Sequence, residues 1–172
     1  MKLEPRLCAI ALGSNLGDRL ANLRAARDLL RGLAHPARPF LQAPVYRSAP
    51  VGCPPGAPEF LNTVVAFHWA GDARRLLSAT QRVEATLGRP PLRAANAPRP
   101  IDLDILACGN ERVATPGLTL PHPRLTARRF VLQPLADILP GLVLPGDRLT
   151  IAAHLGRLPA CEPPLVLAAA DW

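Results

Sequence analysis

The sequence predicts an α+β fold in which a single sheet carries helices on one face. Apolar runs of strand length alternate with stretches of helical period in the order β-α-β-β-α-β. Gly, Pro and Asp separate these runs as turn and cap residues. The chain has 172 residues, 49% of them hydrophobic, which is enough for a core. We therefore expect one domain over residues 1–172.

The first half of the chain supplies three predicted strands and one helix. RLCAIAL, residues 6–12, is typical of a buried strand. GSNLGD predicts a turn, and Asp18 is a good N-cap for a helix with leucines at helical spacing. Residues 40–48 predict a second strand and residues 60–69, rich in β-branched and aromatic residues, a third. A Pro- and Gly-rich loop, 49–58, separates these two strands.

The second half completes the predicted order. Asp72 caps a helix that runs to about Leu87, residues 88–100 lack periodicity and predict a mobile loop, and 101–109 predict a strand. VLQPLADIL predicts a short helix, and a helix and a last apolar strand follow from Thr150. This order indicates a ferredoxin-like β-α-β-β-α-β core with helices packed on the sheet. The C-terminal extension is then expected to cover the other face.

The composition argues against secretion and membrane insertion. No apolar run approaches the ~20 residues of a membrane span. The first residues lead straight into a strand pattern and show no signal-peptide architecture. The four cysteines, Cys8, Cys53, Cys108 and Cys161, are scattered and lack zinc-site spacing. We expect a cytoplasmic protein without a membrane partner, with Cys8 and Cys108 as reduced core residues.

The charge is strongly basic, with a net charge of +7 in which Lys2 is the only lysine. Arginine binds phosphate through a planar two-pronged fork, so this bias suits a phosphorylated ligand or a nucleic acid. An arginine-for-lysine mutational bias would produce the same composition without any function. Charge alone does not decide between these readings.

The segment PRPIDLDILACG, residues 98–109, carries the clearest chemical signal. Strand alternation places Asp102 and Asp104 on one face. Two carboxylates about 6–7 Å apart repel each other unless a cation lies between them. Mg²⁺ prefers such oxygen ligands and keeps phosphate and water as further ligands. Arg99 adds a phosphate donor, so the segment suits a Mg-nucleotide site and a strand with a solvated polar face about equally well.

Other residues admit a functional and a structural interpretation. Glu84 falls on or beside the apolar stripe of its helix, where it either pairs with a buried arginine or faces a site. His122 lies between two prolines and is fixed in a loop, as a phosphate donor or a rigid turn residue. Phe60 and Phe130 are core residues by default. Asn62 shares a strand face with Phe60.

Several segments together resemble one known family. They are ALGSNLGDR, YRSAPVG, FLNTVV, QRVEATLGR, PRPIDLDIL and LPHPRLTARRFVLQPL. In these segments the chain is similar to the 6-hydroxymethyl-7,8-dihydropterin pyrophosphokinase family of the folate pathway. The resemblance implies that ATP gives its β,γ-diphosphate to the hydroxymethyl group of the pterin and leaves AMP. After about Leu142 the resemblance carries little.

The resemblance also implies which residues form the site. Two Mg²⁺ ions are expected on Asp102 and Asp104, with ATP as co-substrate. The implied catalytic residues are Arg89, Arg99, Asp102 and Asp104. The implied ATP-binding residues are Gln81, Glu84, Arg89, Arg99, Ile105, Thr119, His122 and Arg128. The pterin is expected between Phe60 and Phe130, and the implied pterin-binding residues are Gly13, Ser48, Ala49, Val51, Phe60, Asn62 and Phe130.

The loop 88–100 departs from the family at Ala95 and Asn96, where a basic and an aromatic residue are common. Arg93 is a candidate to replace the basic residue. Because the loop has four prolines and no apolar period, we expect it to close as a lid over bound ATP, with Arg89 contacting the nucleotide. Its role in covering the pterin is the part that the departures put in question.

Two further functions compete with this enzyme. The β-α-β-β-α-β order and positive charge also suit an RNA-binding module, but FLNTVVAF offers only Phe60 and Phe67 and no RNA-recognition motif. A catalytically inactive paralogue is a third reading, against which the intact D-L-D and Arg99 argue. We therefore expect a monomeric enzyme that binds ATP and the pterin and no nucleic acid.

Overall fold

The computed structural model describes residues 4–50, 56, 58–89, 98–159 and 165–172. The strands are β1 (Arg6–Ser14), β2 (Leu41–Gln42), β3 (Val45–Ser48), β4 (Phe60–Trp69), β5 (Asp102–Cys108), β6 (Val113–Thr115), β7 (Leu118–Leu120) and β8 (Val166–Ala169). The helices are α1 (Arg19–Arg31), α2 (Ala73–Thr86), α3 (Arg129–Ile138) and α4 (Ile151–Gly156), with a short 3₁₀ turn at Leu125–Ala127. The predicted β-α-β-β-α-β order is present.

The main sheet has the strand order β5-β1-β4-β3-β8, and β2 pairs with β4 beside β3. Every neighbouring pair is antiparallel. The sequence predicts one strand over 40–48, whereas the structure has two short strands there. Pro44 lies between them and has no N–H for the ladder, so the strand is interrupted. β6 and β7 form a separate hairpin.

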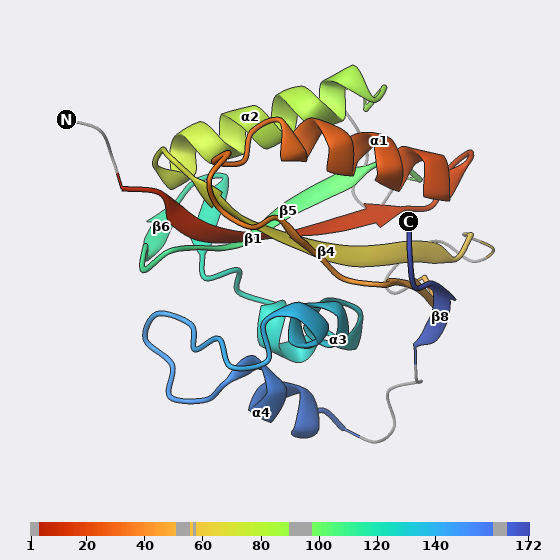
Figure 1. Cartoon of the computed structure of the whole chain (residues 1–172). Helices are drawn as coiled ribbons and strands as arrows, with labels where there is room; N and C mark the ends of the chain where they lie inside the picture. Colours follow the sequence, from red (N-terminus) through yellow and green to blue (C-terminus); the bar gives the residue numbers. More distant parts are fainter. Residues whose placement is uncertain (1–3, 51–55, 57, 90–97, 160–164) are drawn as a thin grey trace.

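Two helical layers enclose the sheet (Figure 1). α1 and α2 lie on one face, and α3 and α4 lie on the other. Side chains alternate between these layers: Ile10 and Phe67 belong to the cluster under α1 and α2, while Ala9 and Val64 pack with α3. The second layer confirms the expectation that C-terminal elements cover the other face.

The two predicted helix caps are present. The Asp18 carboxylate accepts a hydrogen bond from the Ala21 N–H at 3.0 Å. The Asp72 carboxylate accepts one from the Arg75 N–H at 2.8 Å. Each satisfies a backbone donor that the first helical turn leaves free, which fixes where the chain turns from strand into helix.

The end of the chain docks onto the strands beside α1. Trp172 is 8% exposed, and its indole Nε1 donates a hydrogen bond to the Ala43 carbonyl at 2.8 Å. The Arg27 guanidinium lies 5.0 Å from the centroid of the Trp172 ring. Arg27 also donates to the backbone oxygen of Trp172. This contact closes one end of the core cluster under α1.

Cys8 and Cys108 are free thiols buried in the core, as the sequence predicts. They face each other across β1 and β5, with their sulfur atoms 3.1 Å apart. The hydrogen bond with Cys108, together with burial, raises the pKa of Cys8. Cys53 and Cys161 lie outside the described residues. In the described part of the chain, no helix has the length and hydropathy needed to cross a membrane.

Candidate active site

A cavity of about 400 Å³ lies where the C-terminal ends of β1 and β3 meet the N-terminal ends of β4, β5 and α3. Its described lining residues are Ala11, Leu12, Gly13, Ser48, Ala49, Phe60, Asn62, Thr63, Arg89, Arg99, Asp102, Asp104, Arg124, Arg128, Phe130 and Val131. The lining combines four arginines, two carboxylates and two aromatic rings. The cavity therefore offers a charged part and a flat apolar part.

The floor of the cavity is a row of residues across three strands. Gly13 of β1 lies opposite Asp102 of β5 and opposite Asn62 of β4. A Cβ added at Gly13 would lie 3.3 Å from Asn62 Oδ1 and 3.8 Å from a Phe60 ring carbon. Glycine here keeps the space between the carboxylate and the amide open.

The two carboxylates of β5 both face the cavity, as strand alternation predicts. Leu103 and Ile105 point the opposite way, into the cluster under α1 and α2. Burial and the neighbouring Asp102 charge raise the pKa of Asp104. The pair is thus arranged so that a bound cation would lower its electrostatic energy.

Asp102 is held between two arginines. Arg89 Nη1 lies 2.6 Å from Asp102 Oδ1, and Arg99 Nη1 lies 3.3 Å from Asp102 Oδ2. Although burial opposes it, the charges of Asp102 and Glu84 raise the pKa of Arg89. The short pair fixes Arg89 at the edge of the cavity, whereas the longer pair holds Arg99 only weakly.

Glu84 forms an ion pair with an arginine, which is one of the two alternatives that its place on the helix predicts. The carboxylate contacts Arg89 and accepts a hydrogen bond from the Leu103 N–H at 2.7 Å. Glu84 is 8% exposed, and burial raises the pKa of its carboxyl group. It joins α2 to β5 behind the carboxylate pair.

The apolar part of the cavity combines aromatic rings and one amide. Phe60 at the start of β4 and Phe130 in the first turn of α3 both line it. Asn62 is 6% exposed and donates a hydrogen bond from Nδ2 to Ser48 Oγ at 2.7 Å. The Arg128 guanidinium lies 5.4 Å from the centroid of the Phe130 ring. This region presents flat faces and a fixed polar group.

Five residues that the resemblance implies for ATP are not among the described lining residues: Gln81, Glu84, Ile105, Thr119 and His122. Ile105 is 5% exposed within the core. His122 accepts a hydrogen bond at Nδ1 from the Arg124 N–H at 3.2 Å, and burial lowers its pKa. Val51 and residues 90–97 of the expected lid lie outside the described residues.

Arg124 lines the cavity and was missed from the sequence. A signal was available, because Arg124 lies in the PHPRLTARRF segment between His122 and Arg128. Its charge lowers the pKa of Arg128, second to burial, so the two guanidinium groups lie close enough to repel each other. An anion between them would relieve that repulsion.

The carboxylates of Asp102 and Asp104 are ligands of the kind that Mg²⁺ prefers. Among the described residues no group of three or more His, Cys, Asp or Glu side chains could hold a metal ion. Asp102 and Asp104 therefore offer two hard oxygen ligands and leave the other positions to phosphate and water. Mg²⁺ in nucleotide sites is bound in this way.

Comparisons with known proteins agree on one family. The family model described as 7,8-dihydro-6-hydroxymethylpterin-pyrophosphokinase matches residues 9–140. The 2-amino-4-hydroxy-6-hydroxymethyldihydropteridine pyrophosphokinase of Pseudomonas aeruginosa is 40% identical over 155 residues, which cover 90% of each chain. The protein of the same name from Bacillus subtilis is 42% identical over 130 residues, 75% of each chain.

Longer proteins match over part of their length. The mitochondrial folate synthesis bifunctional protein of Pisum sativum is 39% identical over 156 residues, 88% of this chain and 29% of the pea protein. The solved structure of wild-type Plasmodium falciparum HPPK-DHPS with pteroate has a TM-score of 0.71 at 12% identity. It covers 91% of this chain, which spans 45% of the Plasmodium chain, and it shows that the fold is shared.

Proposed function

The chain belongs to the 7,8-dihydro-6-hydroxymethylpterin-pyrophosphokinase family, and on that premise we propose that it transfers the β,γ-diphosphate of ATP to 6-hydroxymethyl-7,8-dihydropterin. The products are the pterin diphosphate and AMP, a step of folate synthesis. One observation carries the proposal: a single cavity is lined by two carboxylates, four arginines and two phenylalanines. Charged groups for a polyphosphate and flat faces for a heterocycle therefore meet at one place.

The pterin end is assigned to the aromatic part of the cavity. Phe60 and Phe130 would enclose the flat ring, because aromatic faces pack well against a planar heterocycle. Asn62 would read its donor and acceptor edge, since the bond to Ser48 holds the amide in one orientation. Gly13, Ser48 and Ala49 supply the adjoining wall. Val51 stays a prediction.

The ATP end is assigned to the arginines. Arg89, Arg99 and Arg128 line the cavity beside the carboxylates, where they would contact phosphate oxygens. The first turn of α3 starts at the same place, and free N–H groups at a helix start favour an anion. Parts in ATP binding for Gln81, Glu84, Ile105, Thr119 and His122 stay predictions.

Catalysis would consist of positioning and of charge stabilisation. Phosphoryl transfer needs little covalent chemistry from the protein. Arg89, Arg99 and Arg128 would stabilise the negative charge that develops on the transferred diphosphate. Asp102 and Asp104 would hold two Mg²⁺ ions, which when bound supply neutralisation of phosphate charge. To do so, Asp102 must exchange its present arginine partners for the cation.

The remaining expectations join the proposal. The order β5-β1-β4-β3 with antiparallel neighbours supports the ferredoxin-like assignment of the core. A single domain, a monomer and a cytoplasmic location are proposed with it. The RNA-binding alternative gains no support, because Phe67, one of its two aromatic residues, is 0% exposed and stacks on Phe40 in the core.

The test is to incubate the protein with Mg-ATP and 6-hydroxymethyl-7,8-dihydropterin and to separate the nucleotide products. We expect AMP, formed only when the pterin is present, and no AMP when EDTA removes divalent cations. Release of ADP as the main product would refute pyrophosphate transfer. Full activity in EDTA would refute the Mg²⁺ part alone.

A further inference from the structure

The ladder between β1 and β5 ends beside the cavity, and one side chain continues it. The antiparallel pairing reaches Gly13 opposite Asp102. The residues just before β5 include Pro100, which has no N–H to donate. Asn15 takes over at this point: its backbone N–H donates to the Arg99 carbonyl at 3.3 Å, and its Oδ1 accepts from the Arg99 N–H at 2.8 Å.

Asn15 is deeply buried, and of the two polar atoms of its side-chain amide only the oxygen has a hydrogen-bond partner among the described residues. It is 2% exposed, and its Nδ2 has no hydrogen-bond partner among the described residues. A buried amide donor without a partner is unfavourable, and buried polar groups rarely lack one. Because an N–H can only donate, the bond from Arg99 also fixes which end of the amide faces it. The hydrogen bond from the Arg99 N–H to Asn15 Oδ1 is therefore the contact that the Asn15 side chain provides.

Arg99 depends on that backbone anchor. Its guanidinium has one long ion pair, at 3.3 Å to Asp102, and its buried Nε has no hydrogen-bond partner in the described part of the chain. The side chain is 19% exposed at the cavity wall. With so little holding the guanidinium itself, the position of the Arg99 backbone decides where the charge lies.

We propose that Asn15 is a positioning residue that fixes the backbone of Arg99 and so aims its guanidinium at the phosphate end of the cavity. The inference rests on the proposed pyrophosphate transfer. Asn15 itself does not line the cavity in the described residues, so it acts through Arg99. An apolar residue at position 15 would leave the Arg99 N–H without its acceptor and free residue 99 to shift.

The neighbouring Asn22 provides a matched control. Its Nδ2 donates to the Leu16 carbonyl at 2.9 Å and to Ser14 Oγ at 3.3 Å, so it braces the same loop without touching Arg99. If position 15 mattered only for the shape of this loop, Asn22→Ala would be as harmful as Asn15→Ala. If it acts on Arg99, only Asn15→Ala lowers turnover.

The experiment measures AMP formation by the full chain and by five variants: N15A, N15D, N22A, R99A and N15A/R99A. We expect N15A to lower kcat about tenfold or more, since the loss of one stabilising contact to developing charge costs up to about 10²–10³. The KM for the pterin should stay unchanged, because Arg99 serves the phosphate end. N15D keeps an acceptor oxygen and should recover most of the lost kcat.

Non-additivity decides the mechanism. On the R99A background, N15A should change kcat by less than about twofold, because residues that act through one another do not add. An equal loss in both backgrounds, a rise in the pterin KM alone, or an N22A effect as large as that of N15A would overturn the proposal. A wild-type chain that forms no AMP would refute the proposed function itself, whereas an active wild type with a fully active N15A refutes only the role of Asn15.

Discussion

Replacing Trp172 with alanine tests whether the end of the chain is part of the core. The indole is 8% exposed, packs into the cluster under α1, and donates a hydrogen bond to Ala43. The motifs that carry the family resemblance lie before about Leu142, so they give no reason to expect this contact. The structure predicts that the last residue contributes to folding and not to catalysis.

The magnitude follows from the area that the indole buries. A tryptophan of this burial removes about 200 Å² from water, worth about 5 kcal/mol at 25 cal/mol per Å² as an upper bound. Measured truncations of buried aromatic residues to alanine cost about 3–5 kcal/mol. The Ala43 carbonyl would not lose its only partner, because Thr63 Oγ1 also donates to it at 2.9 Å. We therefore expect about 3–5 kcal/mol, or a fall in Tm of roughly 6–20 °C for a chain of this size.

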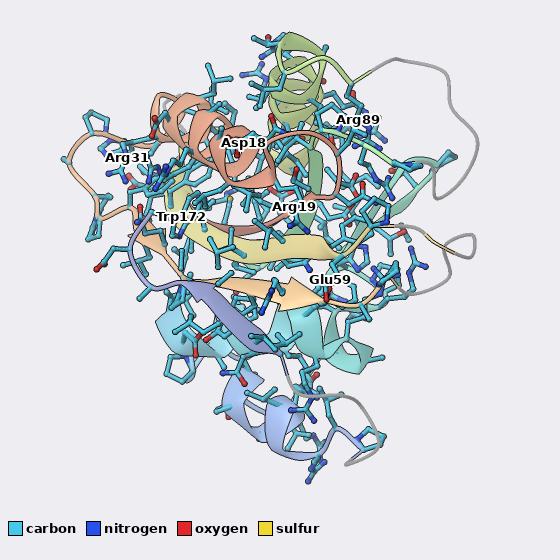
Figure 2. All side chains as sticks on the ribbon, turned by 90° about the vertical axis from the view of Figure 1, so that its right-hand side faces the viewer. Asp18, Arg19, Arg31, Glu59, Arg89 and Trp172 are labelled. Carbon is cyan, nitrogen blue, oxygen red and sulfur yellow. The ribbon has the colours of Figure 1, made fainter. Side chains whose placement is uncertain are left out.

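Unfolding of Trp172→Ala should be followed by far-UV circular dichroism in urea and on heating, because the chain has only two tryptophans and the variant removes one fluorophore. Leu167→Ala in β8 is the control, since that side chain is 55% exposed and should change stability by no more than about 0.5 kcal/mol. Figure 2 places Trp172 and Arg89 on opposite sides of the view, so turnover of the folded variant should be unchanged. A loss below about 1 kcal/mol would refute the reasoning.

Three further outcomes follow from the site and the sheet. Asp104→Asn should keep the fold, because it removes repulsion with Asp102, but lose about 10²-fold or more in kcat for AMP formation; near-normal turnover at ordinary Mg²⁺ would contradict the assignment. Arg89→Ala should lower kcat far more than the affinity for a non-hydrolysable ATP analogue measured by calorimetry, because its contact is expected mainly in the closed state. Equal losses in both would contradict this. Burial and the hydrogen bond to Asp137 raise the pKa of Tyr46 from 10.0 to about 12, so the folded state keeps this proton after the unfolded chain has lost it. The free energy of unfolding should therefore fall as pH rises from 10 towards 12. Urea titrations of Tyr46→Phe should show a smaller fall over this range. The same pH dependence in wild type and variant would show that titration of Tyr46 does not cause the fall.

Local pattern was enough to predict the elements that frame the site. Alternation along β5 correctly placed Asp102 and Asp104 on one face, and Asp18 and Asp72 were correctly predicted as helix caps. These features depend on residues a few positions apart, which sequence periodicity records directly. The resemblance then supplied residues of the cavity that periodicity alone would have assigned to the core.

Contacts between distant segments were beyond that pattern. Nothing near Trp172 in the sequence indicates that its indole reaches Ala43, and nothing near Asn15 indicates that its side chain extends a ladder to Arg99. The break of residues 40–48 into β2 and β3 was missed, although Pro44 was visible, because a proline can also lie on a strand edge. Such features are settled by tertiary contacts and not by local preference.

The four guanidinium groups around two carboxylates give the described lining of the cavity a surplus of positive charge before any ligand binds. A field of this sign draws polyanions toward the opening from several ångströms away and repels free divalent cations. Encounter with a nucleotide should accordingly be steered, with an association rate that falls steeply as ionic strength shortens the Debye length. The metal would then enter mainly as a complex with the nucleotide. Such a complex keeps a net negative charge and is attracted by the positive field at this opening, whereas a free divalent cation is repelled.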